Sequence, residues 1–361
     1  MTHVKKFMII VGARPNFIKG APLLQEIAKY QNIKPVLVHT GQHYDYKMSQ
    51  IFFQELAIPQ PDYNLGVGSA SHATQTAKIM LALEPVMLEE KPDLVIVVGD
   101  VNSTLAGALT AVKLQIPVAH IEAGLRSFDM AMPEEINRRL TDHLSDFLFV
   151  SEDIGVKNLS REGIVRNKIY LVGDILIDAL QNEKRKVKNG KVKNTKILTK
   201  FKLEPKSYAV LTLHRPANVD NPKTLKKLLK IFAIIQKRVP IIFPVHPRTQ
   251  KKLPPDTGLT CLAPLGYPDF LSLISQAKFV LTDSGGLQTE TTFLKIPCLT
   301  LRETTEKPLT VEQGTNILCG QNQKKIIQEV DKILNNPLKI IQPPKLWNGK
   351  TAQRIVKILN Y

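Results

Sequence analysis

Residues 93–104 have the sequence DLVIVVGDVNST, and this stretch decides the fold class. Five consecutive apolar residues, 94–98, are followed by Gly99 and Asp100. A helical pattern that begins with small and polar residues then covers 103–114. A short apolar run without polar alternation is typical of a strand buried on both faces, as in parallel sheets covered by helices. We therefore predict a β-strand, a loop and an α-helix in succession, which is the repeating unit of α/β proteins.

The same unit recurs on both sides of this stretch. In the first half the predicted strands are 7–11, 35–40, 93–99, 117–121 and 147–151, and the predicted helices are 16–30, 72–90, 103–114 and 134–144. After a linker at about 183–206 the predicted strands are 208–213, 240–245, 279–282 and 297–301, and the predicted helices are 222–238, 288–293 and 351–360. A chain of 361 residues with this pattern predicts two doubly wound, Rossmann-like domains, 1–172 and 173–350, that face each other across a cleft.

Charge and composition exclude several classes of protein. The formal net charge is +17, and seven Lys and Arg residues without an acid are concentrated in 184–196. These cations are not interleaved with aromatic residues, so we expect a solvated linker and no nucleic-acid partner. No apolar run reaches the roughly 18 residues that span a bilayer, and no signal peptide is recognised before the first strand. We expect a cytoplasmic protein without a membrane span.

Metal sites and disulfides are not expected either. The cysteines Cys261, Cys298 and Cys319 are odd in number and widely spaced, which predicts free thiols rather than disulfides or zinc ligands. The histidines form no HExxH motif or similar cluster of ligands. The sequence therefore implies no metal.

The loop after the first strand, 12–19, has the sequence GARPNFIK. A dinucleotide-binding fold would place GxGxxG here, but only Gly12 is present, so the glycines that admit the pyrophosphate of NAD are missing. Arg14 and Lys19 instead flank a helix N-terminus that Pro15 suits, and this arrangement can hold a diphosphate. An ordinary strand-to-helix turn with two surface cations is the alternative.

A second candidate nucleotide site follows a predicted strand of the second half. The sequence DSGGLQTE at 283–290 opens a helix, with Ser284 as candidate N-cap. Gly285 and Gly286 leave room for a phosphate at the free amide groups. Glu290 comes one helical turn later, where its carboxylate can accept from both ribose hydroxyls. The motif favours a nucleotide site over a plain turn.

Acidic residues follow the strands of the first half. Asp100 and Glu122 end consecutive predicted strands, and Glu134 and Glu135 begin the helix 134–144. Because parallel strands end at one edge of a sheet, we expect Asp100 and Glu122 to lie at the same edge. Clustered carboxylates repel one another and shift their pKa values, as acid/base chemistry requires. The alternatives are helix capping by Asp100 and the ordinary preference of acids for a first helical turn.

Two histidines of the second half also follow predicted strands. His214 lies in the sequence LHRPAN and His246 in the sequence VHPR. Both are expected at the carboxyl edge of the second sheet, where they can face a diphosphate. The histidines expected to serve structure or to lie on the surface are His39, His43, His72, His120 and His143.

Taken together, these segments resemble the non-hydrolysing UDP-N-acetylglucosamine 2-epimerase family. The matching segments, in the family's order, are 12–19, 99–104, 120–127, 133–138, 214–218, 244–247, 283–290 and 304–308. The resemblance implies the GT-B fold, with the last helix 351–361 packed on the first domain, and a homodimer. It also implies interconversion of UDP-GlcNAc and UDP-ManNAc through UDP elimination, a bound 2-acetamidoglucal and UDP re-addition, without NAD or another cofactor. The product would supply ManNAc-type sugars for surface polysaccharides.

The family's functional residues carry over where this sequence matches its motifs. Asp100, Glu122 and Glu134 match the catalytic acids, and His214 matches the histidine near the leaving phosphate. The residues that match substrate contacts are Arg14, Lys19, Arg138, His246, Ser284, Gly285, Gly286, Glu290 and Lys307.

Three positions depart from the family pattern. Lys307 replaces the Arg of many members, which keeps the charge but loses the bidentate fork. The stretch 65–71 lacks the glutamine-rich pattern of members that a second UDP-GlcNAc activates, and Pro-Ala at 216–217 replaces their Arg-Glu pair. These departures argue against such activation, although Gln42 and His43 are retained.

Other activities remain open at this point. A glycosyltransferase of the same fold would share the Ser-Gly-Gly site, but it would need an acceptor and would leave the acids of the first half without a role. An epimerase of a related UDP-sugar, such as a diacetamido uronic acid, would share almost every motif. A non-catalytic anion-binding protein is supported only by the basic linker.

Overall fold

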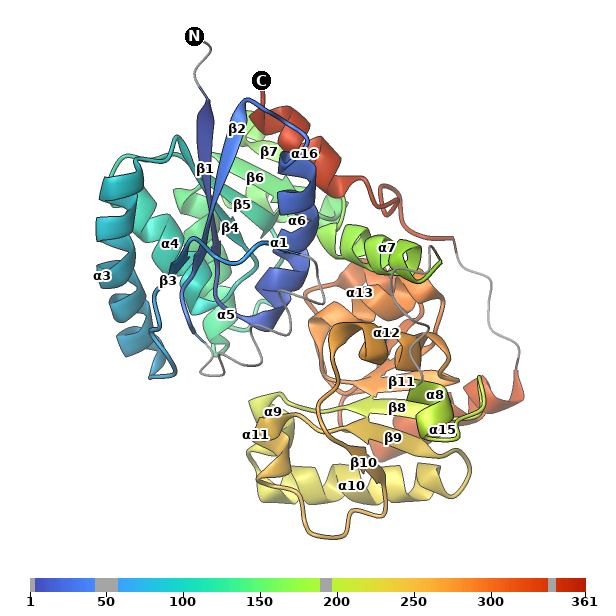
Figure 1. Cartoon of the computed structure of the whole chain (residues 1–361). Coiled ribbons are helices and arrows are strands. Elements are labelled where there is room, and N and C mark those ends of the chain that lie inside the picture. Colours follow the sequence, from blue (N-terminus) through green and yellow to red (C-terminus); the bar gives the residue numbers. More distant parts are fainter. Residues whose placement is uncertain (1–3, 43–57, 189–196, 337–341) are drawn as a thin grey trace. The chain divides into compact units, whose positions relative to one another are not determined.

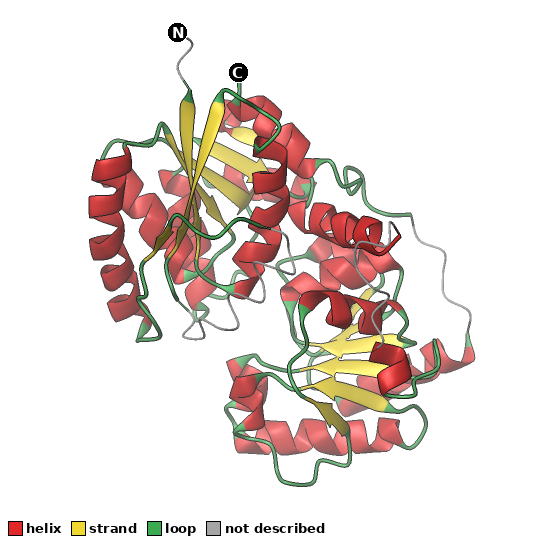
Figure 2. Cartoon of the chain, viewed as in Figure 1, coloured by secondary structure: helices red, strands yellow, loops and turns green. Residues whose placement is uncertain are grey.

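The computed structural model describes residues 4–42, 58–188, 197–336 and 342–361. The chain divides into two compact units, residues 1–182 with 345–361 and residues 183–344. Each unit contains one parallel sheet covered by helices (Figure 1, Figure 2). The α/β class with two Rossmann-like units, predicted from the sequence, is confirmed.

The first sheet, as far as the described residues show, has seven strands in the order β3-β2-β1-β4-β5-β6-β7. Their bounds are β1 (Lys5–Val11), β2 (Ile33–His39), β3 (Tyr63–Asn64), β4 (Leu94–Val98), β5 (Val118–Ala123), β6 (Phe147–Val150) and β7 (Ile169–Leu171). Strands β4 and β5 are buried along their whole length; the sequence of β4 is continuously apolar, whereas that of β5 also contains His120 and Glu122. Their carboxyl ends therefore lie side by side at one edge of the sheet.

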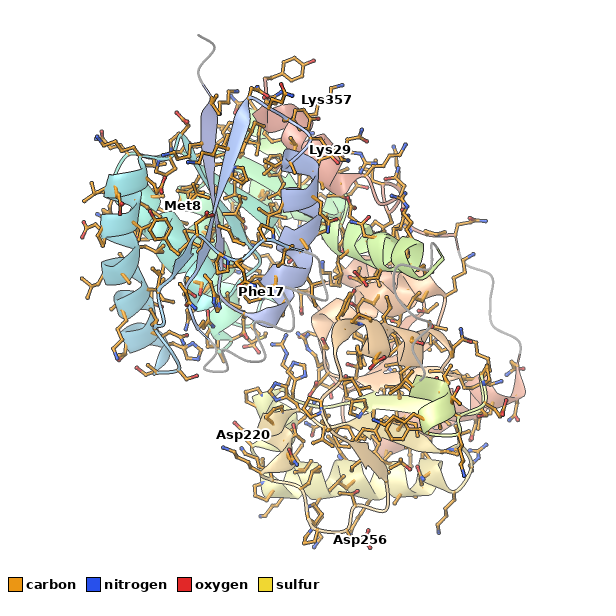
Figure 3. The ribbon with its side chains drawn as sticks, in the orientation of Figure 1. Met8, Phe17, Lys29, Asp220, Asp256 and Lys357 are labelled. Atoms are coloured by element: carbon orange, nitrogen blue, oxygen red, sulfur yellow. The ribbon has the colours of Figure 1, made fainter. Side chains whose placement is uncertain are left out.

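Helices cover both faces of this sheet, with α3, α4 and α5 on one side and α1 and α16 on the other (Figure 1). The bounds of the helices in this part are α1 (Arg14–Ile27), α3 (His72–Glu90), α4 (Asn102–Lys113), α5 (Pro133–Leu144), α6 (Asp153–Arg161), η1 (Arg166–Lys168), α7 (Ile175–Lys188) and α16 (Thr351–Leu359). Met8 of β1 and Phe17 of α1 are only 0% and 3% exposed (Figure 3). No described helix has the length and hydropathy that crossing a bilayer requires.

Helix α16, near the end of the chain, belongs to the first unit. Its first turn is held by Asp178 of α7, whose carboxylate accepts from Thr351 N at 3.1 Å and Ala352 N at 2.9 Å. Burial raises the pKa of Asp178, and these amide donors offset only part of the effect. At the other end, Lys5 Nζ of β1 donates to Leu359 O at 3.2 Å. The contacts tie the last helix to the first unit.

The two units divide within α7, between Asn182 and Glu183, whereas the expected boundary was 172/173. Residues 173–182 belong to the first unit, where Asp178 of α7 holds the start of α16. Ile177 and Leu180 of α7 are fully buried, and burying such side chains stabilises the fold by about 2 kcal/mol each.

The beginning of the predicted linker is helical, which corrects the expectation of a solvated segment from 183 onward. Helix α7 continues to Lys188, because Lys and Arg are good helix formers when no Gly or Pro interrupts them. Lys184 Nζ lies 5.2 Å from the centroid of the Phe293 ring, so this cation contacts protein as well as solvent. Residues 189–196 of the predicted linker lie outside the described residues.

The second sheet, within the described ranges, has six parallel strands in the order β10-β9-β8-β11-β12-β13. The strand bounds are β8 (Ala209–Thr212), β9 (Ile241–Pro244), β10 (Thr260–Leu262), β11 (Phe279–Thr282), β12 (Cys298–Thr300) and β13 (Asn316–Leu318). The helix bounds are α8 (Ile197–Lys200), α9 (Pro216–Val219), α10 (Pro222–Gln236), α11 (Pro247–Gln250), α12 (Tyr267–Ser275), α13 (Gly285–Leu294), α14 (Pro308–Glu312) and α15 (Gln323–Asn335). Apolar side chains of α10 and α15 pack with those of β8, β9 and β11 into one core.

Candidate active site

Asp100 lies directly after β4 at the carboxyl edge of the first sheet. Its Oδ2 is 2.5 Å from Arg138 Nη1 of α5, and its backbone carbonyl accepts from Asn137 Nδ2 at 2.9 Å. Helix α4 has Val101 as N-cap, and no side chain caps it. The alternative that Asp100 caps this helix is therefore wrong. Its carboxylate is 34% exposed and is oriented by a guanidinium instead.

Glu122 occupies a β-bulge in β5. The pairing of β5 with β6 shifts register between Ile121 and Ala123, and Glu122 has a φ of +73°. A non-glycine residue in this left-handed region costs about 1–3 kcal/mol, and it persists only where its surroundings hold it. Bulges of this kind occur next to active sites, where they redirect a side chain. The backbone conformation of Glu122 is therefore typical of a residue whose side chain is positioned for a function.

The Glu122 carboxylate forms an ion pair with Lys19 Nζ of α1. A Cβ on Gly99 would lie 3.5 Å from Glu122 Oε2 and 3.8 Å from Lys19 Nζ, so this pair borders the loop that carries Asp100. The two acids thus lie at the same edge, as expected. Each has its own cation, however, which differs from the expected repulsion between clustered carboxylates.

The loop between β1 and α1 is fixed by Asn16. Its Oδ1 accepts from Ala13 N at 2.9 Å, and its Nδ2 donates to Val98 O of β4 at 2.8 Å. Lys19, the expected diphosphate ligand, contacts Glu122 in this structure. The side chain of Arg14 lies outside the described part of the chain.

The first turn of α5 contains two glutamates in different environments. Glu135 is fully buried and accepts from Ser127 N at 2.8 Å and from Arg138 Nη2 at 2.8 Å. Burial alone would raise the pKa of Glu135, but these donors together lower it to about 2. Glu135 therefore holds the Arg138 that faces Asp100, whereas the half-buried Glu134 stays the candidate acid. The sequence alone left open whether Glu134 or Glu135 is the acid of the site, although the i,i+3 spacing of Glu135 to Arg138 is a signal for their ion pair.

His214 lies after β8 in the second unit, and its Nδ1 is 3.0 Å from Asp283 Oδ1. Asp283 Oδ2 also accepts from Arg215 N at 2.9 Å and from Asn218 Nδ2 at 3.1 Å. Burial would raise the pKa of Asp283, but His214 and the other donors lower it. The His214 and His246 rings lie with centroids 5.8 Å apart. The two predicted histidines are therefore neighbours, and Asp283 orients one of them.

The N-terminus of α13 starts at Gly285, with Ser284 as N-cap. The Ser284 side chain makes no capping hydrogen bond, which differs from the expected role of its hydroxyl. A Cβ on Gly285 would lie 2.1 Å from Glu306 Oε1, so glycine is required at the observed position of this carboxylate. Glu306 Oε2 in turn accepts from Arg302 Nη2 at 2.7 Å. Sequence reasoning missed Arg302 and Glu306.

Two other predicted contacts of the second unit are buried. Glu290 is 6% exposed and accepts from Tyr267 Oη at 3.0 Å, which fixes its carboxylate on α13. Lys307 is 4% exposed and precedes α14 as its N-cap. Its backbone N donates to Thr305 Oγ1 at 3.0 Å. Four of the predicted substrate contacts thus lie on α13 or at its N-cap: Ser284, Gly285, Gly286 and Glu290.

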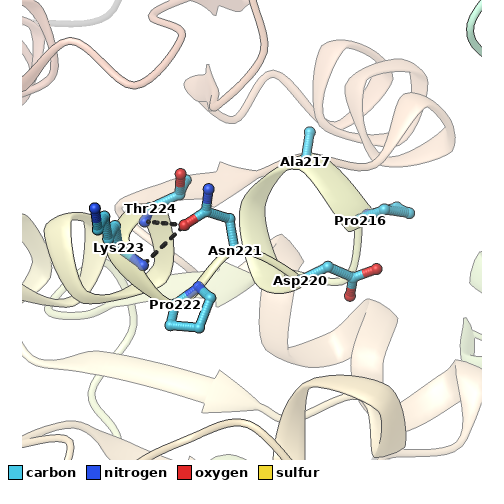
Figure 4. Close-up of a pocket in the computed structure, with 7 residues that line it drawn as sticks. All are labelled: Pro216, Ala217, Asp220, Asn221, Pro222, Lys223 and Thr224. Carbon is cyan, nitrogen blue, oxygen red and sulfur yellow. Dashed lines mark hydrogen bonds between the residues drawn. The ribbon is translucent and has the colours of Figure 1, made fainter.

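A surface pocket lies at the junction of α9 and α10 (Figure 4). Asn221 Oδ1 caps α10 there by accepting from Lys223 N at 2.9 Å and Thr224 N at 3.3 Å. None of the predicted site residues lines it, and we assign it no function. Its lining residues are Pro216, Ala217, Asp220, Asn221, Pro222, Lys223 and Thr224.

Comparison with known proteins places this site in a family. The model of the family described as UDP-N-acetylglucosamine 2-epimerase matches residues 25–360. The chain belongs to this family. The UDP-N-acetylglucosamine 2-epimerase of Methanocaldococcus jannaschii is 48% identical over 368 residues, which cover 99% of both chains. A crystal structure of that organism's UDP-GlcNAc 2-epimerase in complex with UDP-GlcNAc and UDP matches with a TM-score of 0.91 and 46% identity, again over 99% of both chains.

Another relative differs in its sugar. The UDP-2,3-diacetamido-2,3-dideoxy-D-glucuronate 2-epimerase of Pseudomonas aeruginosa is 40% identical over 98% of this chain and 99% of its own. Membership of the UDP-N-acetylglucosamine 2-epimerase family makes this protein an isomerase with a GT-B-type fold. The family resemblance seen in the sequence is confirmed, and the sugar is a separate question.

Proposed function

We propose that the protein interconverts UDP-GlcNAc and UDP-ManNAc by non-hydrolysing 2-epimerisation, without a cofactor. The observation that supports this most is the pair of carboxylates at one sheet edge, Asp100 and Glu122, each oriented by its own cation. The similarity to an epimerase whose structure contains UDP-GlcNAc and UDP supports the same substrate. The product would supply ManNAc-type sugars for surface polysaccharide synthesis.

The proposed reaction begins with removal of the C2 proton by a carboxylate. The electrons of the C2–H bond form the C1–C2 double bond of 2-acetamidoglucal, while the C1–oxygen bond breaks and UDP leaves with its electron pair. In the second half, C2 receives a proton on the opposite face and a phosphate oxygen of UDP adds to C1. Positioned acids and bases are required for both proton transfers. Asp100, Glu122 and Glu134 are the candidates.

The second unit provides candidate groups for the leaving diphosphate. Because the Asp283 carboxylate faces Nδ1 of His214, Nε2 is the ring nitrogen that can approach a phosphate. The free amide groups at the start of α13 favour an anion. Glu290 is assigned to the ribose hydroxyls, and Lys307 and His246 to the rest of the substrate.

Proton NMR in heavy water tests this function directly. With UDP-GlcNAc we expect UDP-ManNAc to accumulate and the H2 signals of both sugars to disappear, because C2 exchanges its proton at each turnover. A parallel incubation uses UDP-2,3-diacetamido-2,3-dideoxy-glucuronic acid, the sugar in the name of the P. aeruginosa relative. If the protein turned over only that sugar, it would replace UDP-GlcNAc as the proposed substrate. No exchange with either would remove the epimerase assignment.

We also infer a homodimer. The apolar side chains of Phe128, Met130, Ile136 and Leu140, on α5 and the loop before it, are 66%, 53%, 41% and 48% exposed. Large apolar side chains exposed on one helix and on the loop before it are typical of protein–protein surfaces. Sedimentation velocity should give twice the chain mass of 40.4 kDa. The double variant Ile136→Lys with Leu140→Lys should sediment as a monomer, whereas Leu81→Lys on α3 should not change the mass. A monomeric native protein would contradict the inference.

A further inference from the structure

Asp142 of α5 contacts β5 on both sides of the bulge at Glu122. Its Oδ1 is 2.6 Å from Nδ1 of His120, two residues before the bulge. Its Oδ2 accepts from the backbone N of Gly124, two residues after it, at 3.1 Å. The same Oδ2 is 2.7 Å from Nη1 of Arg126. A single carboxylate, itself 1% exposed, therefore fixes the strand before and after the strained residue.

His120 extends this contact to the loop of Asp100. Its ring is fully buried, and its Nε2 lies 2.8 Å from the carbonyl oxygen of Gly99, the residue before Asp100. Both ring nitrogens thus face oxygen acceptors, the Asp142 carboxylate and a carbonyl, and neither acceptor has a proton to donate. His120 therefore joins the Asp142 carboxylate to the carbonyl that precedes Asp100.

Arg126 links the two carboxylates of this cluster. It binds Glu162 through two hydrogen bonds, Nε to Oε1 at 2.8 Å and Nη2 to Oε2 at 2.6 Å, and its Nη1 lies 2.7 Å from Asp142 Oδ2. Burial would raise the pKa of Asp142, but His120 and Arg126 lower it. A buried group of this kind is costly unless every charge is paired, and removing one member leaves the others uncompensated.

We propose that Asp142 is a positioning residue that maintains the left-handed backbone of Glu122 and, through His120, the loop that carries Asp100. The strain at Glu122 needs such a device, because an isolated glutamate in β5 would relax to the extended region. The consequence for turnover rests on the proposed epimerase function. The effect on the backbone of Glu122 does not.

Kinetics of Asp142→Asn distinguish positioning from a purely structural role. The variant keeps the size of the side chain and removes its charge, so the bulge loses its support. We expect kcat of the folded variant to fall about a hundredfold, the effect of misplacing a reacting group by about 1 Å. UDP affinity by calorimetry should be unchanged. A structural role alone would lower stability and leave kcat of the folded fraction intact, and that result would overturn the proposal.

Asp146→Asn is the matched control. Asp146 Oδ2 accepts from Val118 N at 3.1 Å, at the other end of the same strand. It therefore also binds the backbone of β5 through a carboxylate, but it lies far from the bulge along the strand. We expect kcat within about twofold of the native value. If Asp146→Asn lowered kcat as much as Asp142→Asn, any contact to β5 would matter equally. That result would contradict a specific role of Asp142.

A structural measurement needs no turnover. A crystal structure of Asp142→Asn should show φ of Glu122 at a negative value, and an unchanged φ would overturn the proposal. If Asp142→Asn does not fold, the same measurement is made on His120→Gln, which loses the ring between Asp142 and Gly99, and an unchanged φ of Glu122 would again overturn the proposal. If the native protein fails to epimerise while φ of Glu122 changes in the variant, the proposed function fails and the positioning role stands.

Discussion

Replacing Asp100 by Asn should lower the rate of epimerisation about a hundredfold or more, the usual effect of losing a positioned acid or base. Asn keeps the size of the side chain but can neither accept the C2 proton nor pair with Arg138 as an ion. UDP affinity should be nearly unchanged, because Asp100 is assigned to the proton transfers and not to the nucleotide. Initial rates from proton NMR in heavy water and calorimetry with UDP measure the two quantities separately.

Asp153→Asn is the control for this substitution. Asp153 also follows a strand of the first sheet and starts helix α6, but its side chain is exposed and no catalytic role is assigned to it. It should keep the native rate. A full-rate Asp100→Asn enzyme would contradict the role of Asp100 and leave Glu122 and Glu134 to carry the proton transfers.

Strand β4 could be predicted because its sequence is continuously apolar. Its five residues are all buried, and such a run has few alternatives in an α/β chain. The short edge strands β3, with two residues, and β7, β10 and β13, with three each, were not predicted. Strands of this length form because a neighbouring strand supplies their hydrogen bonds, and their own sequences contain little signal.

The basic segment after Glu183 shows the limit of composition. A run of lysines without acids is typical of a solvated linker, yet α7 continues to Lys188. Its earlier residues Ile177 and Leu180 are anchored in the core, and a helix once formed extends at low cost through good helix formers. Charge density alone cannot show where such an extension ends.

The positions of the candidate acids followed from topology, but their partners did not. Residues at the carboxyl ends of neighbouring parallel strands must lie together, which predicts Asp100 beside Glu122. The ion pair of Glu122 with Lys19 joins residues 103 positions apart, and that of His214 with Asp283 joins residues 69 positions apart. Such pairings depend on side-chain geometry that a single sequence does not contain. The contacts of Asp142 could not be predicted from the sequence for the same reason.

Gly124→Ala should destabilise the first unit by about 1–3 kcal/mol more than Gly163→Ala, because only the first substitution creates an overpacked contact. Both glycines have a left-handed backbone, with φ of +78° and +82°, so both alanines carry about the same conformational cost of 1–2 kcal/mol. A Cβ on Gly124 would lie 2.5 Å from the carbonyl oxygen of Gly155, whereas a Cβ on Gly163 would have no atom within 4 Å. Urea unfolding of the two variants measures the difference.

The contact at Gly124 cannot be relieved by a side-chain rotation, because the opposing atoms belong to the backbone at the start of α6. Gly124 is also held on both sides, since its N donates to Asp142 and its carbonyl accepts from Asn158 Nδ2 at 2.9 Å. The strand must therefore shift next to Glu122, and the folded fraction of Gly124→Ala should lose turnover, whereas Gly163→Ala should keep it. Equal stability losses in the two variants would show that the backbone of Gly155 yields without cost, and the close approach of β5 to α6 would then not be a reason for glycine at this position.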